Sequence, residues 1–153
     1  MVCLFFFGPA LERYLGSLRF LGLYLFCAIV GGFIGAHCDT VANPSLGASG
    51  AISGVLGAYL ILFPRNRVYV IFFFSIISVP AVVVIVLWVV LQFIGGYASL
   101  AGSQMGGVAY MAHLGGFAAG LATAFVSRLQ FAQEPDTPLR RAYERDPNVY
   151  RIW

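Results

Sequence analysis

Five hydrophobic segments alternate with short, more polar connections along the chain. They cover residues 1–8, 20–36, 51–63, 68–94 and 108–126. The segment 68–94 contains no charged residue. Because an uncharged apolar run longer than about 18 residues is typical of a membrane-spanning helix, the pattern predicts an all-α, polytopic transmembrane helix bundle over residues 1–128. Residues 129–153 are polar and rich in proline and are predicted to form a disordered, solvated tail.

The composition agrees with a membrane protein. Of the 153 residues, 60% are hydrophobic and 10% are charged, whereas about 25% are charged in a typical soluble domain. The net charge of +3 comes entirely from arginine, and the tail arginines alternate with Glu144 and Asp146. A mixed-charge tail of this kind does not indicate a nucleic-acid partner. Cys3 and Cys27 lie in apolar runs and are expected to be small packing residues.

The placement of arginine predicts the orientation in the membrane. Arginines occur in the first connection, in the third connection and directly after the last segment, and the second and fourth connections contain none. Since arginine accumulates on the cytoplasmic side, the first and third connections and the C-terminal tail are predicted to be cytoplasmic. The protein is therefore expected to be an integral, multi-pass membrane protein.

Two segments depart from a simple membrane span. About 11 residues precede Glu12, which as a helix would reach roughly 17 Å, about half of a hydrocarbon core. Spanning the membrane would also place the charged amino terminus in hydrocarbon, which is costly. Either this segment lies at the membrane interface or the sequence lacks the natural start of the protein, and we expect the second. Pro80 lies inside segment 68–94 and is expected to kink its helix.

Ser49 and His113 are the candidate chemical groups. Ser49 lies 16 residues before Arg65, and His113 lies 15 residues before Arg128. At 1.5 Å per residue these separations correspond to about 24 Å and about 22 Å above the inner arginines. Both side chains are therefore predicted at nearly equal depth on two parallel helices, a few ångströms below the outer surface. A serine and a histidine so placed can form a nucleophile and its general base.

Other interpretations of the same residues remain open. The glycine pairs Gly50-xxx-Gly54 and Gly116-xxx-Gly120 match the pattern of small residues at close helix contacts, and a single serine in such a helix is commonly structural. The cluster at residues 37–39 (His-Cys-Asp) could suggest a metal site, but it has no ligand spacing. Its aspartate could also be a third catalytic residue, although solvation at the interface explains it better. A transporter would need charged residues inside the membrane, and outside the arginine pair at 65 and 67 the stretch 41–126 has none.

Three motifs together resemble the rhomboid family of intramembrane serine proteases. They are Gly47-Ala48-Ser49-Gly50, the family's Gly-x-Ser-Gly motif; residues 112–120 (AHLGGFAAG), its histidine helix; and residues 12–16 (ERYLG), its acidic-Arg-x-Leu-Gly turn. The stretch 43–64 is also similar to bacterial members, and this similarity implies a location in a bacterial inner membrane. The resemblance covers residues 1–128, with the motifs in the family's order and spacing.

The resemblance implies a serine endopeptidase that cleaves transmembrane segments of other membrane proteins. By this likeness Ser49 is the nucleophile, His113 is the general base, and Gly47 and Gly50 belong to the oxyanion-binding motif. Gly54, Gly116 and Gly120 would pack the two helices together. No metal or organic cofactor is expected. Substrate would enter laterally beside segment 68–94.

The sequence also departs from the family pattern. The family's first helix, its long first loop, and the histidine and asparagine of its second helix would all lie before Met1. Losing one oxyanion donor costs about 10²–10³ in rate. Ser53 stands where some members have a tyrosine beneath the catalytic histidine. The alternative function is therefore a non-catalytic rhomboid-like protein that binds membrane proteins, inactive because of the missing N-terminal part.

Overall fold

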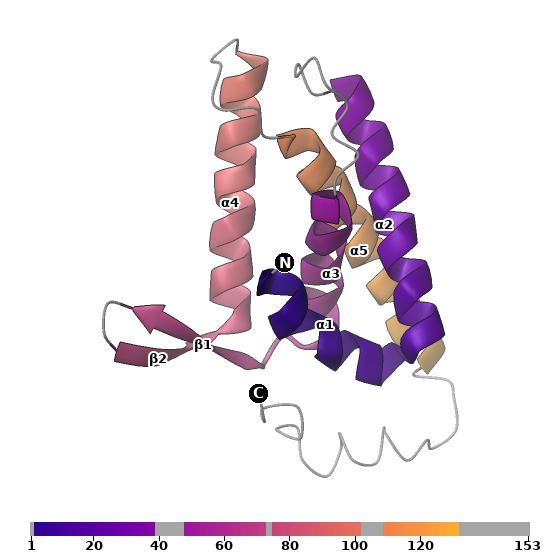
Figure 1. The fold of residues 1–153 in the computed structure, drawn as a ribbon, viewed down its shortest axis with the longest axis vertical. Helices are drawn as coiled ribbons and strands as arrows, with labels where there is room; N and C mark the ends of the chain where they lie inside the picture. The colour runs from indigo at the N-terminus through magenta and orange to yellow at the C-terminus, as the bar shows by residue number, and fades with distance from the viewer. Residues whose placement is uncertain (1, 39–47, 73–74, 102–108, 132–153) are drawn as a thin grey trace.

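The computed structural model describes residues 2–38, 48–72, 75–101 and 109–131, which form a helical bundle with one small β-hairpin (Figure 1). The elements in chain order are α1 (Val2–Leu15), α2 (Ser17–Cys38), α3 (Ala48–Leu62), β1 (Arg67–Phe72), β2 (Ser75–Pro80), α4 (Ala81–Leu100) and α5 (Tyr110–Phe131). Three of the predicted segments, 20–36, 51–63 and 108–126, correspond to α2, α3 and α5. The predicted helical bundle is therefore confirmed for the described part of the chain.

The central helix of the bundle is α3. It packs most extensively against α5 and then against α2, and it also contacts α1 and α4. Ten of its 13 residues from Gly50 to Leu62 are buried, and six of these ten are glycine, alanine or serine. Small side chains let neighbouring backbones approach closely, which explains how so short a helix can contact all four others. At its far end the ring of Tyr59 packs against Phe7 and Phe63, with centroids 4.8 Å and 5.1 Å away.

Glycines set the distance between α3 and α5. A Cβ atom added at Gly116 would overlap the carbonyl oxygen of Gly50, and one added at Gly120 would overlap the carbonyl oxygen of Gly54. Because the residue numbers of these pairs rise together, the two helices run parallel. A larger residue at Gly116 or Gly120 would require the helices to separate.

The segment 68–94 is not one helix, as the sequence predicted. Its first part pairs with itself as the antiparallel hairpin β1–β2, and α4 begins only at Ala81. Pro80 therefore kinks no helix; it is the last residue of β2 and precedes the first residue of α4. Arg67 links the two strands of the hairpin. It donates from Nε to Ser78 Oγ and from Nη2 to the Ser78 carbonyl oxygen, both at 2.8 Å. The buried residue Asn66 accepts the Ala81 N–H at 2.9 Å and so joins the hairpin to α4.

A single glycine separates α1 from α2. The φ angle of Gly16 is 83°, a backbone conformation that costs other residues about 1–2 kcal/mol. The Gly16 N–H donates to the Glu12 carbonyl oxygen at the end of α1. The Gly16 carbonyl oxygen accepts the Phe20 N–H at the start of α2. Helix α1 thus continues through residues that the hydrophobic pattern assigned to a connection. The glycine of the ERYLG motif is required by this turn.

Two helices of the described chain, Ser17–Cys38 and the part Ala81–Ala98 of α4, are long and apolar enough to cross a membrane. Both expose large hydrophobic side chains, including Ile29 at 70% and Phe93 at 62%. Exposed apolar surface of this extent is suited to lipid. The α1–α2 turn, the hairpin and the end of α5 lie at one end of the bundle (Figure 1). These parts, with the turn that precedes β1, carry the described arginines: Arg13, Arg19, Arg65, Arg67 and Arg128.

Candidate active site

Ser49 is the second residue of α3 and its side chain is half-buried. The first four N–H groups of a helix have no acceptor within the helix, so the backbone N–H of Ser49 is one of these terminal donors. The carbonyl oxygen of Ser49 accepts a hydrogen bond of 2.8 Å from Ser53 Oγ, one turn further along. Ser53 is 1% exposed, and this bond satisfies its hydroxyl inside the bundle.

His113 lies in the first turn of α5 and is also half-buried. A Cβ atom added at Gly50 would lie 3.4 Å from the carbonyl oxygen of Ala112. The direct neighbours of Ser49 and His113 in the sequence are therefore in contact. Since α3 and α5 run parallel, the serine and the histidine lie on adjacent helices at the same level of the bundle, each in the first turn of its helix.

A third helix contributes two side chains around His113. His113 Nδ1 lies 2.8 Å from Gln92 Oε1 on α4, in a hydrogen bond between residues that are 21 positions apart. The ring of Trp88, one turn earlier on α4, has its centroid 6.0 Å from that of His113, with 38° between the planes. Neither residue was assigned a role from the sequence. Their spacing of four places them on one helix face, and a glutamine in an otherwise apolar run was the available signal.

The remaining candidate residues have different surroundings. Gly47 and the aspartate at position 39 lie outside the described residues. Gly54 lies against Cys27 of α2 as well as against α5: a Cβ atom there would overlap the cysteine side chain. His37 is exposed at the end of α2, where its Nδ1 is 2.8 Å from the carbonyl oxygen of Phe33.

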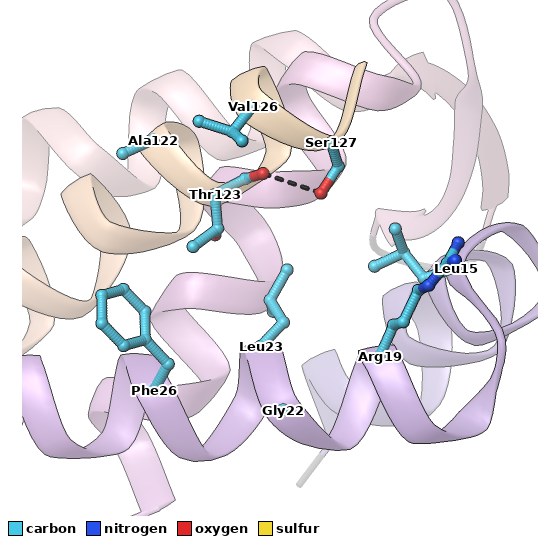
Figure 2. Close-up of a pocket in the computed structure, with 9 residues that line it drawn as sticks. All are labelled: Leu15, Arg19, Gly22, Leu23, Phe26, Ala122, Thr123, Val126 and Ser127. Carbon is cyan, nitrogen blue, oxygen red and sulfur yellow. Dashed lines mark hydrogen bonds between the residues drawn. The ribbon is translucent and has the colours of Figure 1, made fainter. Parts of the chain in front are cut away.

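A groove of about 390 Å³ lies between α2 and α5, at the end of the bundle that carries the arginines. Its lining is mainly apolar, with Arg19 and Phe26 on α2 facing Thr123 and Ser127 on α5 (Figure 2). The hydroxyl of Ser127 donates to the Thr123 carbonyl oxygen at 2.8 Å. The groove is separated from His113 by more than two turns of α5, so it is not part of the Ser49–His113 region.

These features define a membrane helix bundle in which a serine and a histidine begin two adjacent, parallel helices. Residues 1–130 match the family described as "Rhomboid domain". The chain therefore belongs to the rhomboid family, whose members are integral membrane proteins and include serine proteases. The resemblance that the motifs indicated is confirmed.

Several curated proteins are similar to the chain. Rhomboid protein 1, mitochondrial, of Saccharomyces cerevisiae is 35% identical over 122 residues, which is 76% of this chain and 33% of that protein. RHOMBOID-like protein 4 of Arabidopsis thaliana is 33% identical over 126 residues, 82% of this chain and 29% of that protein. Rhomboid protease GluP of Bacillus subtilis is 48% identical over 60 residues, 39% of this chain and 11% of that protein.

The chain thus spans a third or less of the length of these relatives. No solved structure shows a significant match to it.

Proposed function

We propose that the chain is an intramembrane serine endopeptidase that cleaves transmembrane segments of other membrane proteins with a Ser49–His113 dyad. The observation that carries the proposal is the backbone contact between α3 and α5. It brings the neighbours of the two residues together at one end of both helices. Similar proteins from Bacillus subtilis bear the names rhomboid protease GluP and putative rhomboid protease YdcA, which also supports a protease.

The proposed reaction is acyl transfer to serine. Ser49 Oγ attacks the carbonyl carbon of the scissile peptide bond, and the His113 imidazole accepts the hydroxyl proton. The protonated imidazole then gives this proton to the departing amine, and the peptide bond breaks. In the second half of the cycle a water molecule attacks the acyl-serine ester, and the histidine again takes and returns a proton. The dyad needs no metal or organic cofactor.

The N-terminus of α3 supplies the proposed stabilisation of the oxyanion. The N–H of Ser49 has no acceptor within the helix, and the amino end of a helix carries a partial positive charge. Gly47 and Gly50 belong to the same Gly-x-Ser-Gly motif. Removing one such donor from a serine protease costs about 10²–10³ in rate, so this N–H is expected to contribute substantially.

The proposed orientation places Ser49 and His113 toward the outer side of the membrane. Cytoplasmic ends of membrane helices are rich in arginine, and the described arginines gather at the opposite end of the bundle. The tail after α5 would then be cytoplasmic. A bacterial inner membrane stays a proposal, because the similar proteins include both bacterial and mitochondrial ones.

Labelling of the detergent-solubilised chain with a fluorophosphonate probe tests the dyad. The probe reacts with an activated serine, so the wild-type chain should be labelled, whereas Ser49→Ala and His113→Ala should not be. His37→Gln and Ser127→Ala are matched controls that remove a histidine and a serine far from the pair, and both should be labelled normally. Thermal unfolding of each variant establishes that it is folded.

The outcomes separate the two candidate functions. Labelling that disappears in both dyad variants and persists in both controls supports the endopeptidase, which cleavage of a single-span membrane protein in proteoliposomes would then establish. A folded wild-type chain that is not labelled would refute catalysis by this polypeptide. Binding of the same single-span protein without cleavage would then favour the non-catalytic binder.

A further inference from the structure

We propose that Gln92 is a positioning residue that holds the His113 ring in the tautomer able to act as a base. This inference rests on the proposed function and assigns a role to a side chain on a third helix. The Gln92 amide would fix the proton of the neutral imidazole on Nδ1. The lone pair is then on Nε2, the ring nitrogen on the opposite side from Gln92.

The hydrogen bond itself supports this assignment. Gln92 Oε1 and His113 Nδ1 are 2.8 Å apart, a normal length for N–H···O. An amide oxygen can only accept a hydrogen bond, so Nδ1 must be the donor. A neutral imidazole carries one proton, and with that proton on Nδ1 its remaining nitrogen, Nε2, is an acceptor. Only an accepting nitrogen can take the proton of a serine hydroxyl.

The surroundings of Gln92 indicate that the contact is specific. The neighbouring side chains Leu91 and Phe93 are exposed at 55% and 62%, whereas Gln92 is half-buried and turned toward α5. An amide without a partner is costly in an apolar environment, which favours a conformation with a lasting hydrogen bond. Trp88 packs near the same imidazole one turn away. Two side chains of one α4 face therefore restrict both the rotation and the protonation of the ring.

The amide also explains how the dyad could work without a carboxylate. Serine proteases of the triad type orient their histidine with an aspartate that accepts from Nδ1–H. A carboxylate in a membrane helix carries a large desolvation penalty, whereas the neutral amide oxygen of Gln92 accepts the same hydrogen bond without a net charge. The amide would orient the ring of His113 but stabilise its protonated form less strongly than a carboxylate does.

The opposite orientation of the amide makes the proposal easy to refute. If the NH₂ group of Gln92 faced His113, it would donate to Nδ1, and the ring proton would lie on Nε2. Such a ring could not accept a proton from serine through Nε2. The two amide orientations therefore require different histidine tautomers, which nitrogen chemical shifts distinguish directly.

The first test is NMR of the full chain labelled with ¹⁵N-histidine. The chain contains two histidines, so His37→Gln leaves His113 as the only imidazole signal. With Gln92 present we expect a protonated Nδ1 and an unprotonated Nε2 at neutral pH. In Gln92→Met, which has a similar shape without an acceptor, this preference should be lost. A protonated Nε2 in the Gln92 chain, or identical shifts in both chains, would overturn the proposal.

The second test measures how fast the fluorophosphonate probe labels the serine. Misplacing a catalytic group can cost about 10²-fold, so Gln92→Met should label about 10-fold to 100-fold more slowly. Gln130→Met is the matched control, because Gln130 is exposed at the far end of α5, and it should label at the normal rate. Gln92→Glu keeps an acceptor at this position, so it should restore most of the labelling rate that is lost in Gln92→Met.

The two proposals can fail separately. If labelling needs Ser49 and His113 but is unaffected in Gln92→Met, the dyad stands and the positioning role is refuted. If no variant or wild-type chain is labelled, the proposed function fails. The nitrogen shifts would then still show whether Gln92 sets the tautomer of His113.

Discussion

Alanine at Gly120 tests whether the α3–α5 contact is as close as the structure indicates. The added Cβ would lie 2.6 Å from the carbonyl carbon of Gly54 and 2.7 Å from its Cα. Carbon atoms in favourable contact are about 3.5–4.0 Å apart, so the helices would have to separate by roughly 1 Å. The obstructing atoms belong to the backbone, and no side-chain rotation can relieve the overlap.

The expected magnitude follows from two opposing effects. Overpacking costs about 1–3 kcal/mol, and we take the upper end because backbone atoms are involved. Replacing glycine by alanine within a helix returns about 1 kcal/mol, which leaves a net loss of about 2 kcal/mol. For a chain of this size 1 kcal/mol shifts Tm by about 2–4 °C, so Tm should fall by about 4–8 °C. Gly22→Ala is the matched control: nothing lies within 4 Å of its added Cβ, and its Tm should stay constant or rise.

Cys27 provides the assay. It is 0% exposed and lies against Gly54 at the junction of α2, α3 and α5. In a chain with Cys3→Ser and Cys38→Ser, a thiol-reactive fluorophore can label only Cys27, and only after this junction opens on heating in detergent. Equal Tm values for Gly120→Ala and Gly22→Ala, or a rise for Gly120→Ala, would refute the close backbone contact.

Three further outcomes can be checked by thermal unfolding, followed through Cys27, or by the rate of fluorophosphonate labelling. Asn66→Leu removes the buried hydrogen bond of 3.1 Å from Asn66 Nδ2 to the Tyr59 hydroxyl, so it should lower stability by about 1–2 kcal/mol; unchanged Tm would contradict this. Gly16→Ala has space for its Cβ but must adopt a φ of 83°. It should lose about 1–2 kcal/mol, and Gly16→Asn should lose less, because asparagine tolerates this conformation better. Trp88→Leu should slow fluorophosphonate labelling, but by less than loss of the amide acceptor does, since the ring restricts His113 without fixing its tautomer; a larger effect would reverse that ranking.

The sequence predicted well where composition changes sharply. The ends of α2 and α3 and the start of α5 lie within three residues of the predicted segments because polar or glycine-rich connections interrupt the apolar runs there. Helix α5, however, continues to Phe131, five residues past the predicted segment and into the predicted tail. The glycine pattern at positions 50, 54, 116 and 120 pointed to a close helix contact, and in the structure a Cβ atom at Gly116 or Gly120 would overlap the backbone of Gly50 or Gly54. Such a pattern is readable because only the smallest side chain permits the contact.

The segment 68–94 shows where this reasoning stops. Both halves are strongly apolar, with six β-branched residues among positions 68–80 and eight among positions 81–94. Residues 68–72 and 75–80 nevertheless form strands, and those from 81 form a helix. Neither hydrophobicity nor β-propensity separates them, and Pro80 marks a boundary that a kinked helix would also explain. The hydrogen-bond partner of Gln92 likewise could not be predicted from the sequence, because it depends on how α4 approaches α5 in three dimensions.

In the proposed enzyme, the exposed surface of α4 would make the chemistry depend on the physical state of the lipid. Its 20 residues would extend about 30 Å, the thickness of a typical hydrocarbon core, and Leu87 and Ile94 expose 60% and 61% of their surface. A helix supported mainly by acyl chains tilts when the bilayer becomes thicker or thinner, whereas α3 and α5 are locked together through their backbones. The hydrogen bond between Gln92 and His113 connects α4, which faces the lipid, to α5, which is packed against α3. We therefore expect the rate of serine labelling to change between bilayers of short and long acyl chains, and constancy across them would argue against it. The proposed protease would in this way respond directly to membrane thickness.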